Sequence, residues 1–244
     1  MRIIPSIVID GESAVNTVSY SSPIYLGDPS HIAHLYTAMG APELCLIRRT
    51  QTELTNRDFL TIEGVASNAF IPLCYGGGIR TYEHCLTILS LGVEKIIFNT
   101  LPREKGFDII TRVSSLYGSQ AIALMIDIDE ATSHRTPYSE NLKKYIFSAV
   151  DSGVGEVILS VKTKNGTFSG ISKKSAAFSS RLNLPVPVLL AGGFNTIDQV
   201  TELSSQYDFS GVLVGSSFSF ATYSRESRLV NTRDMHQNNV FDND

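Results

Sequence analysis

Apolar and polar residues follow two alternating patterns along the chain. Short runs rich in Ile, Val and Leu are separated by stretches whose apolar residues recur at helical spacing, an order typical of βα units in a parallel sheet. The pattern predicts strands at Ile3–Ile9, Leu44–Ile47, Ile71–Tyr75, Lys95–Phe98, Ala121–Ile126, Val157–Ser160, Val186–Leu190 and Gly211–Val214. It predicts helices in the gaps, for example at His31–Met39, Glu83–Leu91, Phe107–Tyr117, Ser139–Asp151 and Ile197–Gln206. Such strands can close into a barrel or spread as an open, doubly wound sheet.

An internal repeat favours the barrel, because three segments recur about 115 residues further along the chain. Gly40–Leu44 recurs as Gly153–Val157, the turn at Gly77 recurs at Gly192, and Lys95–Phe98 recurs as Gly211–Val214. These offsets imply two fused (βα)4 halves, which close naturally into a ring, although chance similarity among apolar strands is the alternative. We therefore predict an α/β fold, a single (βα)8 TIM barrel over residues 1–244.

Two polar segments stand apart from this pattern. Residues 10–29 follow the first strand, with Gly11 and Gly27 as hinges, and predict a lid over the top face of the barrel. Beyond Phe220 the chain turns polar, and we expect a last helix there and a frayed polar tail from about residue 225.

Composition narrows the classes of partner. A net charge of −4 and a pI near 5.7 argue against binding nucleic acid or an acidic membrane surface, but not against phosphate ligands, which backbone N–H groups can hold. Three cysteines without a C-x-x-C pair predict neither a disulfide framework nor a zinc site, and they favour a reducing cytoplasm. No apolar stretch reaches the roughly 18 residues of a membrane span. We expect no metal ion and no cofactor.

Glycine and small polar residues gather where predicted strands end. Chemistry in (βα)8 barrels sits at these carboxyl ends, and glycine lets backbone N–H groups approach an anion closely. The candidate phosphate-binding residues are Gly77, Gly78, Asn99 and Thr100 in the first half, and Asn165, Gly166, Gly193, Gly215 and Ser216 in the second. Ordinary turn chemistry is the alternative at each position. Because the groups fall on opposite halves, we predict a small ligand with a phosphate at each end.

Motifs spread over most of the chain carry a family resemblance. They are Arg2–Pro5, Gly27–Pro29, Glu43–Leu44, Ile71–Leu73, Gly76–Arg80, Lys95, Asn99–Thr100, Gly118–Ala121, Ile126–Asp127, Gly155–Glu156, Asn165–Thr167 and Gly192–Gly193. Together they resemble the cyclase subunit of imidazole glycerol phosphate synthase. That resemblance implies a heterodimer with a glutaminase subunit, whose ammonia is joined to a bisphosphorylated ribulosyl intermediate that is then cyclised and cleaved.

The sequence looks more similar still to a divergent branch of this family. Ser22–Pro29, Pro72–Arg80 and Leu91–Lys95 are similar to the cyclase-like proteins of surface-polysaccharide gene clusters. Those proteins are associated with acetamidino modification of a sugar, alongside a glutaminase-like protein and an ATP-dependent sugar amidotransferase. The resemblance implies the same two partners here.

The catalytic pattern of the resembled family is incomplete in this chain. Asp127 matches one of two catalytic aspartates, but Val8 stands where the other is expected. Because valine cannot exchange a proton, the loss should lower the cyclase rate by roughly 10²- to 10⁴-fold. Asp10 lies on the same strand face and could replace part of the function, whereas Asp127 itself is either catalytic or a plain polar residue of the rim.

Further departures surround this position. Arg48, followed by Arg49, replaces an acidic residue after the second strand, and Asn16 replaces a lysine. Asn165 is neutral where an acidic residue is expected, and the loop over residues 128–138 is shortened. An amide at Asn165 can still donate to phosphate.

Four charged residues fall at the starts of predicted strands, and therefore at the opposite, amino-terminal face of the barrel: Arg2, Glu43, Lys95 and Glu156. The resemblance implies that they form a gate through which ammonia enters from the docked glutaminase. A structural salt-bridge plug is the alternative.

The sequence supports three hypotheses. The first is a cyclase-like subunit that receives ammonia within a glutamine-dependent amidation complex, and so belongs to an enzyme. The second is a true cyclase of histidine biosynthesis, a lyase, with relocated acid–base groups. The third is a non-catalytic scaffold that binds a phosphorylated small molecule.

Overall fold

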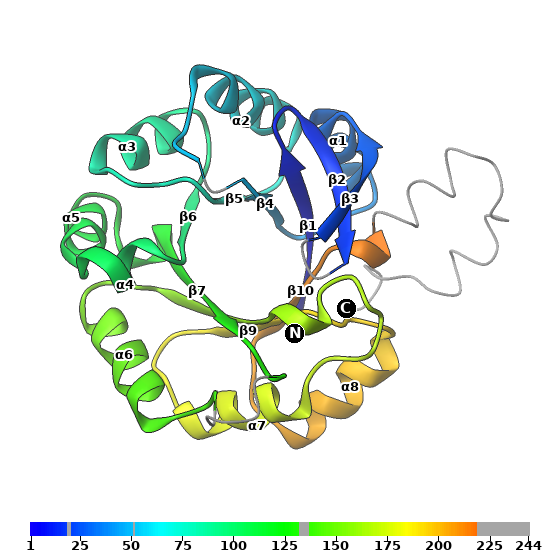
Figure 1. The fold of residues 1–244 in the computed structure, drawn as a ribbon, viewed down its shortest axis with the longest axis vertical. Helices are drawn as coiled ribbons and strands as arrows, with labels where there is room; N and C mark the ends of the chain where they lie inside the picture. Colours follow the sequence, from blue (N-terminus) through cyan, green and yellow to red (C-terminus); the bar gives the residue numbers. More distant parts are fainter. Residues whose placement is uncertain (19–20, 51, 132–136, 219–244) are drawn as a thin grey trace, which may run out of the picture.

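Eight parallel strands form a closed ring in a computed structural model that describes residues 1–18, 21–50, 52–131 and 137–218. The ring runs through β1 (Arg2–Asp10), β4 (Leu44–Arg48), β5 (Leu73–Gly76), β6 (Lys95–Phe98), β7 (Ile122–Ile128), β8 (Glu156–Val161), β9 (Val188–Ala191) and β10 (Gly211–Val214). It closes where β1 pairs with β10, with Arg2 opposite Gly211 (Figure 1). The predicted (βα)8 barrel is confirmed.

Helices surround the ring on its outside (Figure 1). They are α1 (Pro29–Ala38), α2 (Asn56–Asn68), α3 (Tyr82–Ser90), α4 (Leu101–Lys105), α5 (Asp108–Tyr117), α6 (Glu140–Asp151), α7 (Lys173–Leu182) and α8 (Ile197–Gln206). Several begin where a short polar side chain accepts a backbone N–H of the first turn, which fixes the helix start. These caps are Asp28, Thr81, Ser139, Ser172 and Thr196. Within the described ranges, no helix is long and apolar enough to cross a membrane.

Side chains alternate between two cores along each strand, as the two-residue period of a strand requires. One large core lies between the strands and the helices, and a smaller one fills the inside of the ring. The inner core contains Ile4, Cys45, Cys74, Ile97, Ala123, Met125, Ile158, Leu189, Ala191 and Leu213. It is apolar and packed, so it separates the amino-terminal face of the barrel, here called the floor, from the carboxyl-terminal face, here called the mouth.

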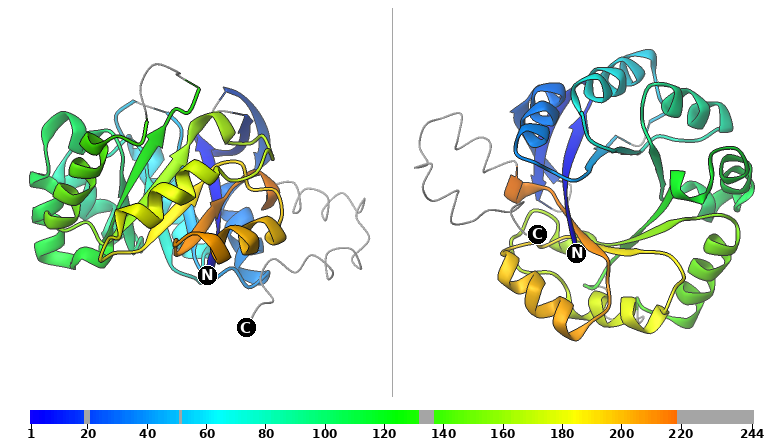
Figure 2. Two further views of the ribbon diagram at one scale, coloured as in Figure 1. Left: turned by 90° about the horizontal axis from the view of Figure 1, so that it is seen from below. Right: turned by 180° about the vertical axis from the view of Figure 1, so that it is seen from behind.

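The polar segment after β1, predicted as a lid, forms a β-hairpin that the sequence analysis did not predict. β2 (Ser13–Val18) pairs antiparallel with β1, and β3 (Ser21–Gly27) pairs with β2. Gly11, at φ +61°, provides the tight turn between β1 and β2, because Asp10 already pairs with Ser13. The hairpin stands on the mouth side, away from the N-terminus (Figure 2).

Some sequence predictions fall outside the described residues. The last helix and the polar tail from about residue 225 lie within residues 219–244, and part of the shortened loop lies within residues 132–136. Both stay predictions.

Candidate ligand site and the charged floor

Two adjoining pockets open at the mouth of the barrel. The first-half pocket is lined by Gly77, Gly78, Asn99 and Thr100, and the second-half pocket by Asn165, Gly166, Gly193, Gly215 and Ser216. Their empty volumes are about 1250 and 720 Å³, open solvent included, and both are bordered by Ile47 and Met125 near the barrel axis. Every predicted phosphate-binding residue therefore lines a pocket, and the two groups occupy different pockets.

Glycine is required at the tightest turns of both pockets. Gly77 has a φ of +114°, and a Cβ there would lie 2.4 Å from the carbonyl oxygen of Arg48. Gly193 has a φ of +84°, and its Cβ would lie 2.4 Å from the carbonyl oxygen of Gly170. No other residue fits such a backbone, which lets loop N–H groups line a concave surface suited to an anion.

The two pockets differ in charge. The first-half pocket is lined by Arg48, Arg49, Arg80 and Lys162, together with Glu104 and Asp127. Among the described residues, the second-half pocket is lined by none that is charged. An anion in the second-half pocket would therefore depend on amides and hydroxyls alone.

Arg48 has a structural role beside the first-half pocket, because all three of its guanidinium nitrogens donate hydrogen bonds to other residues of the chain. Its Nε donates to Asp58 at 2.6 Å, and its Nη1 donates to the carbonyl oxygens of Thr50 and Thr52, both at 2.8 Å. Asp58 also accepts from Thr55 at the start of α2. Burial alone would raise the pKa of Asp58, but the hydrogen bonds from Thr55 and Arg48 outweigh it and lower that pKa. Arg48 thus shapes the loop from β4 to α2.

Asp127 lies at the end of β7 and lines the first-half pocket, with its side chain 21% exposed. Asn99 Nδ2 donates to its Oδ2 at 2.8 Å, and Lys162 Nζ lies 3.1 Å from the same oxygen. Sequence reasoning missed Lys162, which follows β8 directly, because nothing in the local pattern distinguishes it from a solvated lysine. These two contacts hold the carboxylate of Asp127 in place at the wall of the first-half pocket.

Val8 and Asp10 lie at the end of β1, but only Val8 lines a pocket, the second-half one. Asp10 is held by Arg49 and by Thr50, whose Oγ1 donates to Asp10 Oδ1 at 2.9 Å. The hydrogen bonds from Arg49 and Thr50 hold the pKa of Asp10 below its ordinary value. The geometry therefore gives no support to Asp10 as a substitute for the missing acid.

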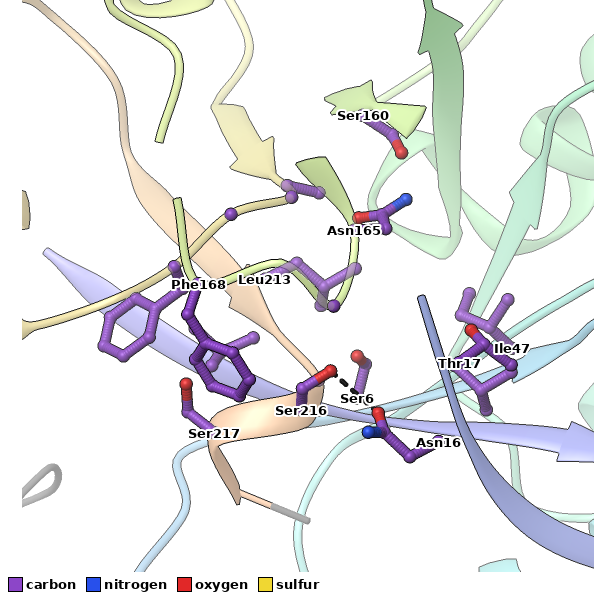
Figure 3. A pocket seen from close by; sticks show the side chains of 18 of the residues that line it. Ser6, Asn16, Thr17, Ile47, Ser160, Asn165, Phe168, Leu213, Ser216 and Ser217 are labelled. Carbon is purple, nitrogen blue, oxygen red and sulfur yellow. Dashed lines mark hydrogen bonds between the residues drawn. The ribbon is translucent and has the colours of Figure 1, made fainter. Parts of the chain in front are cut away.

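The hairpin contacts the second-half pocket directly. Ser216 Oγ donates to Asn16 Oδ1 at 2.7 Å, and Asn16 is buried at 6% exposure (Figure 3). A Cβ on Gly166 would lie 2.1 Å from the carbonyl oxygen of Thr17. The segment predicted as a lid thus forms one wall of this pocket.

The four charged residues predicted at the floor form one closed ring. Arg2 contacts Glu156 and lies 3.0 Å from Glu43, while Lys95 lies 3.1 Å from Glu43 and 2.8 Å from Glu156. Each cation therefore binds both carboxylates. Cys74, from the inner core, donates to Glu43 Oε1 at 2.9 Å.

Burial and charge act in opposite directions in this ring. Burial alone would raise the pKa of Glu43, but the hydrogen bond from Cys74 and the charges of Lys95 and Arg2 lower it. Burial alone would lower the pKa of Lys95, but its surroundings, with Glu156 and Glu43 among them, raise it. Glu43 therefore stays ionised and Lys95 stays protonated in the neutral range, and the four paired side chains close the floor around the barrel axis.

The described residues contain no group of three His, Cys, Asp or Glu side chains placed to hold a metal ion. The three cysteines are free and buried.

The molecule is thus a closed (βα)8 barrel with two glycine-lined pockets at its mouth and a ring of paired charges at its floor. Residues 2–224 match the histidine biosynthesis protein family, and the chain belongs to that family. The family-level resemblance is thereby confirmed, while the branch associated with surface polysaccharides stays a prediction.

The chain is similar to proteins of several bacteria. It is 31% identical over 229 residues to "Putative imidazole glycerol phosphate synthase subunit hisF2" of Pseudomonas aeruginosa, covering 90% of each chain. It is 30% identical over 230 residues to the protein named hisF3 of Vibrio vulnificus strain YJ016, with 90% of this chain and 88% of the relative covered. It is 28% identical over 232 residues to "Putative imidazole glycerol phosphate synthase subunit HisF" of Leptospira borgpetersenii, with 89% of each covered.

Proposed function

We propose that this chain is a cyclase-like subunit that receives ammonia from a glutaminase subunit in a glutamine-dependent amidation complex. The observation that carries the proposal is a contrast between the two faces of one barrel. The floor keeps a closed ring of four paired charges, whereas the mouth has Val8 where the resembled cyclases have an acid. This contrast suits a subunit that still receives ammonia at its floor but no longer performs the ring closure of the resembled cyclases.

The mouth supplies what an ammonia acceptor requires. Two pockets can anchor a phosphorylated small molecule at both ends, with Ile47 and Met125 between them. Asp127, held by Asn99 and Lys162, faces the same space and can take a proton from the attacking nitrogen. Specifically, we propose that the complex serves the acetamidino modification of a surface-polysaccharide sugar in the cytoplasm. An ATP-dependent sugar amidotransferase is the third partner.

Assembly with a glutaminase tests the proposal. The chain is co-expressed with a candidate glutaminase subunit from the same organism, and the pair is analysed by size-exclusion chromatography and by glutamine hydrolysis. We expect a heterodimer and a rise in hydrolysis of about tenfold, within the usual range of coupling between subunits. Glu156→Lys places a third cation in the ring and should weaken both the association of the two subunits and the rise in glutamine hydrolysis. Lys105→Met, on the exposed end of α4, should change neither the association nor the hydrolysis. A pair that neither associates nor alters hydrolysis contradicts the proposal.

A true cyclase is the second candidate, because all the predicted phosphate-binding residues line the two pockets and Asp127 lies beside them. Its test is turnover of the bisphosphorylated ribulosyl substrate with added ammonium. We expect the natural chain to give little product and Val8→Asp, which restores a second carboxyl at the mouth, to give more. Equal and rapid turnover by both would favour the cyclase over the amidation subunit.

A further inference from the structure

Lys162 is the cation that the structure places against Asp127 in the first-half pocket. Asp127 lies near the end of β7, the neighbouring strand β8 pairs with it, and Lys162 comes directly after β8. Lys162 Nζ lies 3.1 Å from Asp127 Oδ2, and both side chains line the pocket. The Lys162 side chain is 52% exposed, so a ligand in the pocket can reach it. Two neighbouring strands thus present an ammonium group and a carboxylate side by side.

Two other basic residues near this mouth are held by structural partners. Arg48 is 6% exposed and donates to Asp58 at the start of α2. Lys164, two residues beyond Lys162, donates to the carbonyl oxygen of Gly170 at 2.9 Å and lines neither of the two pockets. Lys162 differs from both, because its partner is the candidate catalytic carboxylate and not a loop or a helix end.

Adding ammonia to a carbonyl carbon requires two proton transfers. The nitrogen must lose a proton as the new N–C bond forms, and the carbonyl oxygen must gain one as its π bond breaks. Asp127 can take the first proton, but Val8 stands where the resembled cyclases have an acid that could give the second. A lysine ammonium group carries three N–H donors and can give a proton in the same way. Lys162 therefore supplies the type of group that Val8 lacks.

We propose that Lys162 is a catalytic acid that works with Asp127 in ammonia addition at the mouth. Ammonia attacks a carbonyl carbon of the phosphorylated ligand, Asp127 takes a proton from the nitrogen, and Lys162 gives a proton to the oxygen. The product carries an amino group and a hydroxyl group on one carbon, and no further reactant is consumed. The proton on Asp127 then passes to Lys162 across the 3.1 Å contact, which restores the pair. This inference rests on the proposed function, because it assigns the proton transfers at the same mouth.

Removing the lysine and then restoring its amino group chemically tests this role in the full chain. Lys162→Cys is treated with 2-bromoethylamine, which rebuilds a side chain of lysine length that ends in an amino group. The three natural cysteines are buried, so the new thiol is the accessible one. The rate measured is the incorporation of nitrogen from isotopically labelled ammonium into the bisphosphorylated ribulosyl substrate, followed by mass spectrometry.

The expected results separate proton donation from the filling of space. Lys162→Cys should lower the rate of incorporation about hundredfold, and bromoethylamine should restore most of it. Iodoacetamide, which adds a neutral amide at the same thiol, should restore none. Lys173→Met, at the exposed start of α7, is the control and should leave the rate unchanged. Asp127→Asn combined with Lys162→Cys should be about as slow as the slower single variant, because the two residues act as one pair.

Three results would overturn the acid–base pair. They are an unchanged rate in Lys162→Cys, equal rescue by the two reagents, and no incorporation by the natural chain, because a complete pair should accelerate this addition. Thermal unfolding verifies that each variant is folded. The assay contains no glutaminase, so a failed heterodimer with a lysine-dependent rate removes the proposed function alone. A heterodimer whose rate of incorporation does not depend on Lys162 removes the pair alone.

Discussion

The floor and the mouth of this barrel treat polar side chains in opposite ways. At the floor, Arg2, Lys95, Glu43 and Glu156 bind one another until each cation contacts both carboxylates. At the mouth, Ser160 and Asn165 keep buried polar atoms that bind nothing in the described protein. Removing one partner from a complete charge network costs stability, and a buried polar group left unpaired costs stability as well.

The two pockets repeat this contrast on a smaller scale. The first-half pocket carries four cations, but Arg48 binds Asp58 and loop carbonyl groups, and Arg49 binds Asp10. Position at the rim is therefore a poor guide to a role in binding. The contacts that a side chain already makes decide whether it is free to bind a ligand.

The largest effect expected from breaking the contrast is at the floor. Lys95→Met leaves two buried carboxylates with Arg2 alone, and the free energy of unfolding should fall by about 3–5 kcal/mol. Urea denaturation followed by circular dichroism measures it. Lys105→Met, at the exposed end of α4, is the matched control and should change it by less than about 0.5 kcal/mol. Equal losses of stability for Lys95→Met and Lys105→Met would mean that the charged ring does not stabilise the folded chain.

Arg48→Met tests whether a mouth cation can be purely structural. The change leaves Asp58 buried beside the start of α2, and we expect a loss of about 3 kcal/mol in the free energy of unfolding. The exposed Arg57, 83% exposed and 3.7 Å from Glu12, is the control, and Arg57→Met should cost less than about 0.5 kcal/mol. Phosphate affinity of a folded Arg48→Met protein should stay close to normal, and a large loss of affinity with full stability would contradict this role.

Acid should weaken the floor through Glu43. Because its pKa is lower in the folded chain than the ordinary value of 4.5, its contribution to stability is fully present above that value and is lost as the pH falls through the folded pKa. The melting temperature should therefore drop below about pH 4.5, with Asp10 and Asp58 adding to the drop from 3.8 downward. Glu43→Gln should be less stable than the natural chain at pH 7 by about 1–3 kcal/mol, and its melting temperature should depend less on pH. Parallel pH curves for the two proteins would exclude Glu43 as a source of the acid sensitivity.

The smallest and most telling effect is expected at the mouth. Ser160→Ala removes a buried hydroxyl that binds nothing in the described chain, so the free energy of unfolding should stay within about 0.5 kcal/mol of the original or rise slightly. The same denaturation experiment measures it beside Lys95→Met. A loss above about 2 kcal/mol would show that this hydroxyl has a structural partner after all.

The sequence predicts the architecture well because repetition and apolar periodicity encode it. The strands at Lys95–Phe98 and Gly211–Val214 and the helix Ile197–Gln206 have the predicted bounds. The hairpin was missed because β2 and β3 mix Ser, Asn, Thr and Pro with their apolar residues, and their pairing depends on the turn at Gly11. Periodicity cannot reveal such a local contact.

Side-chain partners are less accessible from sequence than strand ends. Strand order alone places Glu43 and Glu156 at one face of the barrel, so the floor ring could be predicted from residues far apart. The link from Arg48 to Asp58 depends on how one loop folds, and nothing in the sequence distinguishes Lys162 from its neighbour Lys164 before the loop after β8 is known.

The pairing of β1 with β10 has a consequence for synthesis of the chain. The first strand to leave the ribosome acquires its last neighbour only when residues 211–214 have been made. Until then β1 keeps one unpaired edge, the kind of edge that recruits strands from other nascent chains. The bond from Ser216 to Asn16 also forms only at that final stage, so the hairpin and the end of the barrel become ordered together. A message cut short before codon 211 should therefore yield a product that is cleared by proteases or aggregates, and not a smaller working barrel.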